Sequence, residues 1–290
     1  MNEVGTRDRE RLVLDASAIN ALEADKSLCA VARSLGGAFE FVVPATAFSE
    51  VFACPDQALR RRLFEAIRLV LDSGICLRSF SWIVQEHVKA YWRDPSSYDW
   101  RRHGVRFWEL EEEIYRDELI HSVSAETRAM HKKLEALFRD VHRDVKAAFP
   151  TPARSREPSP SLREVTKALL AVKGPCLVVG AGLIESVVGR NPSGAETRAF
   201  MERSPPFKAM LLAEAVAFYD RCLRPERERS PGRAGRIDML SAVYLPYCSA
   251  FVTNDNGQWR ALKEVSALAH LSASVLRYSE FRSRALALRL

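Results

Sequence analysis

Four acidic residues occupy positions in which a carboxylate can take part in chemistry. Asp15 directly follows the apolar run at 12–14, and Asp255 follows the apolar run at 250–252 after two polar residues. Two further acids lie near the start of predicted helices, which completes the set Asp15, Glu50, Asp238 and Asp255. A carboxylate at the end of a buried strand costs free energy unless something pairs with it. These positions therefore predict that the acids share a partner.

The partner that suits four such carboxylates is a divalent cation. Four bare anions cannot share one site, because their repulsion raises their pKa values or forces them apart. Oxygen ligands of this kind suit Mg²⁺ or Mn²⁺. A divalent ion held by them can bind and polarise a phosphodiester and supply a hydroxide nucleophile at neutral pH. The acids alone thus predict a metal-dependent nuclease centre.

The segments around these acids alternate between strand and helix patterns. Short apolar runs bounded by turns predict strands at 11–15, 36–44, 75–80, 250–257 and 272–278. Apolar residues at helical spacing predict helices at 17–35, 45–52, 57–74, 81–92, 237–248 and 258–265. Such alternation is typical of a parallel α/β sheet. Ligands of open parallel sheets bind at the carboxyl ends of the strands, where Asp15 and Asp255 are expected.

Between the two sheet-forming parts lies a mostly helical segment. We therefore expect a domain in two parts, 1–92 and 236–290, with a helical insertion at 93–235. Within the insertion, 105–149 has one apolar face at helical spacing, 150–161 is a Pro/Ser-rich linker, and 224–236 is an exposed loop. Packing is the simplest role for the insertion, and a substrate clamp or a partner surface stay open.

At these motifs the sequence resembles the PIN domain nucleases. The resemblance is carried by LVLDASAI, ATAFSEV, IDMLSAVYL and FVTNDNGQW, which contain the four acids in order, and it covers about 11–92 and 236–283. One departure is the 188 positions between Glu50 and Asp238, a gap that compact family members close in far fewer residues. Glu65 or Glu86 are the alternatives if the pairing of Glu50 is wrong.

The resemblance implies both a fold and an activity. The fold is a PIN-like parallel-sheet α/β/α domain with a mostly helical insertion. The activity is a metal-dependent ribonuclease, expected to be an endonuclease, in which Asp15, Glu50, Asp238 and Asp255 bind Mg²⁺ or Mn²⁺. Ser17, Thr253 and Asn254 are the residues expected to assist. Because many relatives are toxins, the resemblance leaves open a small antitoxin-like protein partner, and a homodimer is open as well.

Other interpretations of the same residues remain. Asp15 and Asp238 are also good helix N-caps, and Asp255 suits an Asx-turn. A PIN fold that has lost its chemistry and binds RNA or protein is the alternative function. The segment VVGAGLIE (178–185) lacks the third glycine of a dinucleotide-binding fingerprint. LDASA lacks the second aspartate of aspartate-nucleophile phosphatases, so neither of these classes is favoured.

The charge distribution predicts where RNA binds. The chain has 43 Lys and Arg against 37 Asp and Glu, a net charge of +6, and residues 166–237 carry 12 Lys and Arg against 7 Asp and Glu. Arginine suits bidentate phosphate contacts, so the loop before Asp238 is expected to bind RNA through Arg227, Arg229, Arg233 and Arg236. The charged N-terminus, the lack of a long apolar run and six scattered cysteines favour a soluble cytoplasmic protein with reduced thiols.

Overall fold

The computed structural model describes residues 9–29, 32–71, 75–102, 160–224 and 234–288. It also describes helical residues at 125–126, 128–133, 135–136, 139–140 and 143–144. Most of the helix expected over 105–149, the linker at 150–161 and the interior of the loop at 224–236 lie outside the described residues.

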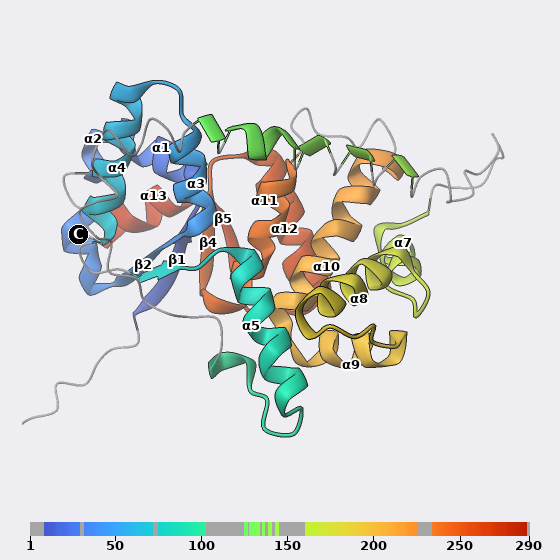
Figure 1. Ribbon diagram of the computed structural model, residues 1–290. Coiled ribbons are helices and arrows are strands. Elements are labelled where there is room, and N and C mark those ends of the chain that lie inside the picture. Colours follow the sequence, from blue (N-terminus) through green and yellow to red (C-terminus); the bar gives the residue numbers. More distant parts are fainter. Residues whose placement is uncertain are drawn as a thin grey trace, which may run out of the picture.

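The fold is built on one parallel sheet of five strands, in the order β3-β2-β1-β4-β5 (Figure 1). The strands are β1 (Glu10–Leu14), β2 (Phe39–Pro44), β3 (Ile75–Leu77), β4 (Ala250–Thr253) and β5 (Ser274–Arg277). From β1 the chain moves outward to β2 and β3, then returns to the other side of β1 to form β4 and β5. The direction of winding therefore reverses between β1 and β4, and this is where open sheets form a ligand crevice.

Helices cover both faces of the sheet. Those of the sheet-forming parts are α1 (Ala16–Ala24), α2 (Lys26–Cys29), α3 (Ala45–Ala53), α4 (Gln57–Leu71), α5 (Phe80–Arg93), α11 (Arg236–Leu240), α12 (Asn256–Ala269) and α13 (Tyr278–Ala287). Those between them are α7 (Leu162–Leu169), α8 (Pro175–Val188), α9 (Gly194–Arg203) and α10 (Pro205–Phe218). The expected parallel α/β architecture is confirmed.

Side-chain alternation along the strands produces two separate cores. Leu12 and Leu14 of β1 point to one face, where they pack with residues of α1, α4 and α13. Val13 points to the other face and belongs to a cluster that includes residues of α5, α10 and α12. Because successive side chains of a strand alternate, this pattern places a helical layer on each side of the sheet, as Figure 1 shows.

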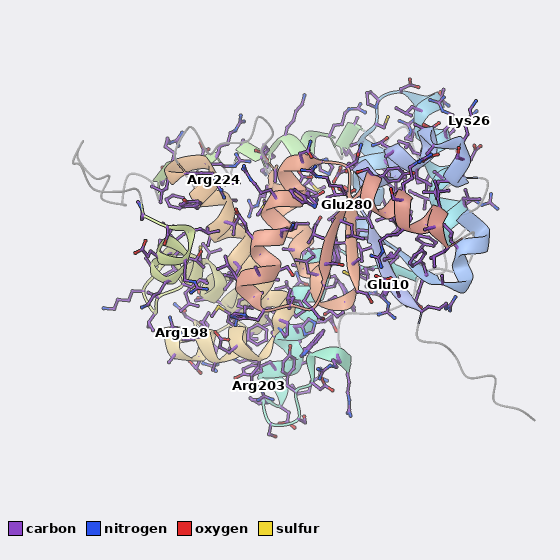
Figure 2. The ribbon with its side chains drawn as sticks, turned by 180° about the vertical axis from the view of Figure 1, so that it is seen from behind. Glu10, Lys26, Arg198, Arg203, Arg224 and Glu280 are labelled. Carbon is purple, nitrogen blue, oxygen red and sulfur yellow. The ribbon has the colours of Figure 1, made fainter. Side chains whose placement is uncertain are left out.

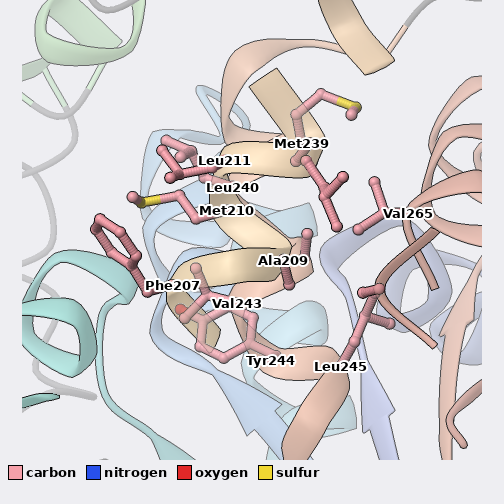
Figure 3. Packing of buried hydrophobic residues seen from close by; sticks show 14 of the residues in the cluster. Phe207, Ala209, Met210, Leu211, Met239, Leu240, Val243, Tyr244, Leu245 and Val265 are labelled. Carbon is pink, nitrogen blue, oxygen red and sulfur yellow. The ribbon is translucent and has the colours of Figure 1, made fainter. Parts of the chain in front are cut away.

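The core on the second face continues from the sheet into the helical segment. Phe207 and Leu211 of α10 are fully buried, and they belong to the same cluster as Tyr244 and Phe251 beside the sheet. Figure 3 shows this packing of α10 against α11 and the residues that follow it. Helices α7 to α10, which lie within the predicted insertion, are thus joined to the sheet by a shared apolar core.

Several predicted boundaries are wrong, for local reasons. The helix expected over 17–35 ends at Ala24, because Asp25 accepts the backbone N–H of Leu28 and starts the separate helix α2. The helix expected over 237–248 is the short α11 followed by a 3₁₀ helix that contains Pro246. The helix expected to run to 74 has its last described helical residue at Leu71, and the final helix, α13, was not predicted.

Three further expectations concern the helices and the thiols. The segment 178–185 lies inside α8, so no strand precedes its glycines and a dinucleotide-binding turn is excluded. No described helix is both long and apolar enough to cross a membrane. The cysteines whose side chains are described, at 29, 54, 176, 222 and 248, are free thiols.

Candidate functional site

Asp15 and Asp255 follow two neighbouring strands at the carboxyl edge of the sheet. Leu14 of β1 pairs with Val252 of β4, so both strands end at the same level. The backbone N–H of Asp15 donates to the carbonyl of Val252 at 3.2 Å, which continues the ladder by one more bond. Both aspartates thus lie where the sheet reverses its winding between β1 and β4, the place at which open parallel sheets bind ligands, and we call this place the acidic crevice.

Ser17 ties the two strand ends together. Its hydroxyl lies 2.9 and 3.0 Å from the two carboxylate oxygens of Asp15, to which it donates. The same oxygen accepts the backbone N–H groups of Asn254 and Asp255 at 2.7 and 3.1 Å, and it lies 3.0 Å from the Thr253 hydroxyl. Ser17 and Thr253 therefore hold the site's backbone in place, whereas the exposed Asn254 contributes its backbone to this network.

Glu50 and Asp238 come from two helices that start above the same edge. Glu50 lies in the second turn of α3, and Asp238 lies in the first turn of α11. The pKa of Glu50 is raised well above its usual range, first by burial and then by the charges of Asp238, Asp15 and Asp255. Glu50 is thus close enough to interact with all three aspartates, and the four predicted acids share one electrostatic neighbourhood.

The environment of Asp15 disfavours its ionised form. Burial raises its pKa to about 7, and the charge of Asp238 adds to this effect, against the opposing hydrogen bonds from Ala18, Thr253 and Ser17. The pKa of Asp238 is also raised, first by burial and then by Asp255. A cation placed among these groups would reverse the shifts, because it favours the charged carboxylates.

The donor set fits a hard divalent cation in type. Each aspartate uses one carboxylate oxygen on a backbone N–H: Asp15 on Ala18 at 2.7 Å, Asp238 on Gly235 at 2.6 Å and Asp255 on Gln258 at 2.7 Å. A carboxylate has about four lone-pair sites, so each aspartate keeps acceptor capacity for a cation of the kind that prefers carboxylate ligands, although Asp15 Oδ2 also lies 3.0 Å from the Ser17 hydroxyl. In the described part of the chain, however, no three His, Cys, Asp or Glu side chains are arranged to hold an ion as they stand.

These backbone contacts also decide whether the aspartates act as helix caps. Asp15 is the N-cap of α1 and Asp255 is the N-cap of α12, while Asp238 accepts the N–H of the residue at the N-cap of α11. The three aspartates therefore cap helices and lie close to one another at the same time. A helix N-terminus also carries partial positive charge, which favours an acid at that position.

The alternatives to Glu50 lie elsewhere. Glu65 is exposed on α4, and Glu86 on α5 forms an ion pair with Lys89 at 3.1 Å. Glu50, by contrast, has its pKa raised by the charges of three of the predicted acids. Of the candidate acids that follow the second strand, Glu50 is the one that the structure brings to the other acids.

Gln258 belongs to the site, although no sequence motif pointed to it. Its side-chain carbonyl accepts the hydroxyl of Thr253 at 2.7 Å, and its Nε2 donates to the backbone carbonyl of Asp238 at 3.2 Å. Gln258 is almost fully buried, so it fixes the strand end of β4 against α11. Its only signal in the sequence is its place three residues after a predicted turn acid.

Glu135 reaches the site from the helical segment. Its carboxylate accepts the backbone N–H of Arg236 at 3.0 Å and pairs with Arg221 at 3.1 Å, and its charge raises the pKa of Asp238. One turn earlier on the same segment, the imidazole of His131 lies 2.8 Å from the hydroxyl of Ser49, next to Glu50. The segment therefore contacts both helices that carry acids, and in Figure 1 it passes across them as the green ribbon.

We expect Glu135→Ala to loosen the start of α11. Gly235, the N-cap residue, has no side chain with which to cap, and Glu135 accepts the next N–H in its place. Loss of a hydrogen bond to a charged group should lower the free energy of unfolding by roughly 1–2 kcal/mol, measured by denaturant titration. Glu135→Gln keeps an acceptor and should lose less. Unchanged amide exchange at Arg236 in Glu135→Ala would contradict this role.

The predicted RNA-binding arginines are only partly placed. Arg227, Arg229 and Arg233 lie outside the described residues. Arg236 begins α11, and its guanidinium faces Glu214 at 3.9 Å. Its position beside Asp238 agrees with the expected proximity to the acids, and its contact with RNA stays a prediction.

Comparison with protein-family models, with curated proteins and with solved structures found no match for this chain.

Proposed function

We propose that this protein is a PIN-like, Mg²⁺- or Mn²⁺-dependent ribonuclease that cuts RNA internally, with Asp15, Glu50, Asp238 and Asp255 as the metal ligands. The observation that carries the proposal is the electrostatic coupling of Glu50 to the other three acids at the carboxyl edge. Three of these acids also cap helices, but capping does not account for the proximity of Glu50, and each charge raises the cost of ionising the others unless a cation is bound.

The chain's own residues prepare the crevice for a cation. Ser17 and the backbone N–H groups at the helix starts hold the aspartates in place, and each carboxylate keeps lone pairs for a ligand. Glu50 supplies a carboxylate whose raised pKa a nearby positive charge would lower. A divalent ion bound there would polarise the phosphodiester and lower the pKa of a water molecule. Because the four acids do not yet form a closed ligand set, we expect them to draw together on binding.

The biological setting rests on the same resemblance. A small antitoxin-like protein or a second copy of the chain would be a partner of this fold, and residues 93–235 provide additional surface for either. A catalytically inactive PIN-like module that binds RNA or protein is the alternative. The presence of all four acids in one crevice favours the enzyme.

A cleavage assay with defined metals tests this function. We expect the purified protein to cut a circular single-stranded RNA, which has no ends for an exonuclease, in Mg²⁺ or Mn²⁺ and not in EDTA. Cleavage that persists in EDTA would overturn the metal mechanism. RNA binding without cleavage in any divalent ion would instead identify the inactive binding module. Mapping the cut ends in total RNA would then define the target.

A further inference from the structure

Two cations converge on one tryptophan at the edge of the sheet. The guanidinium carbon of Arg277 lies 4.1 Å from the centroid of the Trp259 ring, and the ammonium of Lys263 lies 4.5 Å from it. Arg277 ends β5, while Trp259 and Lys263 lie one turn apart on α12. We call these three residues the Trp259 patch.

The Trp259 patch adjoins the acidic crevice. The backbone N–H of Trp259 donates to the carbonyl of Asp255 at 2.9 Å, in the first turn of α12. Arg277 pairs in register with Thr253, so it stands at the carboxyl end of the neighbouring strand. Adjacent strands are about 4.8 Å apart, which places the patch one strand beyond the acids. Figure 2 shows Glu280, three residues after Arg277, at the start of α13 on this side.

Within the described part of the chain, the two cations lack acidic partners, unlike their neighbours. The side chains of Arg277 and Lys263 are exposed, and neither forms an ion pair with a described residue. By contrast, Arg282 pairs with Asp25 at 2.6 Å and Arg284 with Glu10 at 2.9 Å. The carboxylate of Glu280 accepts the backbone N–H of Arg277 and caps α13.

Two cations are not needed to cover the half-buried indole of Trp259. One cation over the ring already gains the attraction to its face, and a second positive charge nearby is repelled by the first. An anion between or beside the two cations removes that repulsion. Stacking on the indole also fixes the orientation of the Arg277 guanidinium and restrains its rotamers, which prepares it for a bidentate contact with phosphate.

We propose that the Trp259 patch binds the phosphate backbone of single-stranded RNA next to the cleavage site, through Arg277 and Lys263. The identity of the ligand rests on the proposed ribonuclease function, whereas its anionic character follows from the two adjacent cations. Contacts of this kind fix the register of the strand without reading its sequence. The patch would hold the RNA on the β5 side of the crevice.

RNA binding to the metal-free protein tests the proposal without any need for cleavage. The test variant is Arg277→Gln with Lys263→Gln, because glutamine keeps much of the side-chain stem over the indole and removes the charge. The matched control is Lys26→Gln with Arg93→Gln, which removes two exposed charges from α2 and α5. Affinities for oligo(U) and oligo(A) are measured in EDTA over a series of salt concentrations, and circular dichroism checks the fold.

We expect the test variant to weaken binding about equally for both RNAs. The slope of log affinity against log salt should fall by about 0.7 for each phosphate that no longer has a cation beside it, hence by about 1.4 for two. The control should retain the wild-type slope. An unchanged slope in a folded test variant, or no RNA binding by the wild type, would overturn the proposal.

The two proposals fail in different ways. If the patch variant has a reduced salt slope but the wild type cuts RNA with no metal, the phosphate site stands and the nuclease mechanism falls. If the wild type cuts RNA in Mn²⁺ and the patch variant binds and cuts as well as the wild type, the nuclease stands and the phosphate site falls.

Discussion

Asp15→Asn is expected to reduce RNA cleavage by roughly 10²–10³-fold or more, the size of effect seen when one group that stabilises developing charge is removed. The asparagine carbonyl can still accept the Ala18 N–H that Asp15 Oδ1 accepts now, so the N-cap of α1 should persist. The variant loses the negative charge, and its amide nitrogen takes the place of Oδ2, which now accepts the Ser17 hydroxyl. Asp238→Asn should behave in the same way, for the same reason. Single-turnover cleavage at saturating Mn²⁺, together with circular dichroism, measures both effects.

Asp94→Asn is the matched control for these variants. Asp94 is an exposed aspartate after α5 that also accepts backbone N–H groups, from Ser96 and Ser97, but it lies outside the acidic crevice. It should leave cleavage unchanged. Full activity in Asp15→Asn would remove Asp15 from the proposed site, and with it the central ligand of the set.

The part of the site that the sequence could predict is the part that a parallel sheet dictates. Asp15 and Asp255 follow apolar strands, and carboxyl ends of parallel strands meet at one edge. Assigning the two strands was therefore enough to predict that these aspartates lie close together. Glu50 and Asp238 were harder, because their positions depend on how α3 and α11 tilt over that edge; they were predicted from their places near the starts of helices, and the family resemblance then supported them.

The contacts from the helical segment could not be predicted in this way. Glu135 is 101 positions from Arg236, whose N–H it accepts, and His131 is 82 positions from Ser49. No local pattern encodes such pairs, because they depend on how a helix crosses the sheet edge. Gln258 is an intermediate case: its bond with Thr253 spans five positions, whereas its bond with the backbone carbonyl of Asp238 depends on how α12 packs against α11.

The three aspartates that cap helices are the same residues that we propose as metal ligands. A carboxylate at the first turn of a helix is stabilised by free backbone N–H groups, whether or not a ligand is nearby. Asp25 shows the same chemistry without a cluster: it starts α2 and pairs with Arg282. What separates Asp15 from Asp25 is first burial, which raises the pKa of Asp15 to about 7 and to which the charge of Asp238 adds, whereas the hydrogen bond and charge of Arg282 lower the pKa of Asp25; only the fold reveals this difference.

The stability of the metal-free protein should fall as the pH rises from about 4 to 7. The pKa of Asp15 is about 7 in the folded chain against a reference value of 3.8, so the folded state binds more protons than the unfolded state over this range. Stability decreases with pH wherever the native state holds the extra proton. Asp15 alone would contribute up to roughly 4 kcal/mol, and the raised pKa values of Glu50 and Asp238 act in the same direction.

The contribution of the crevice is isolated by comparing wild type with Asp15→Asn, since other groups titrate in both. The difference in free energy of unfolding between the two should change with pH in favour of the variant, so that Asp15→Asn is the more stable protein at pH 8 without metal. Mn²⁺ should then stabilise the wild type, because a ligand of the folded state alone at 100 times its Kd adds about 2.7 kcal/mol. In Asp15→Asn with Asp255→Asn that gain should vanish. If Mn²⁺ raises the Tm of this double variant as much as that of the wild type, the ion binds outside the crevice.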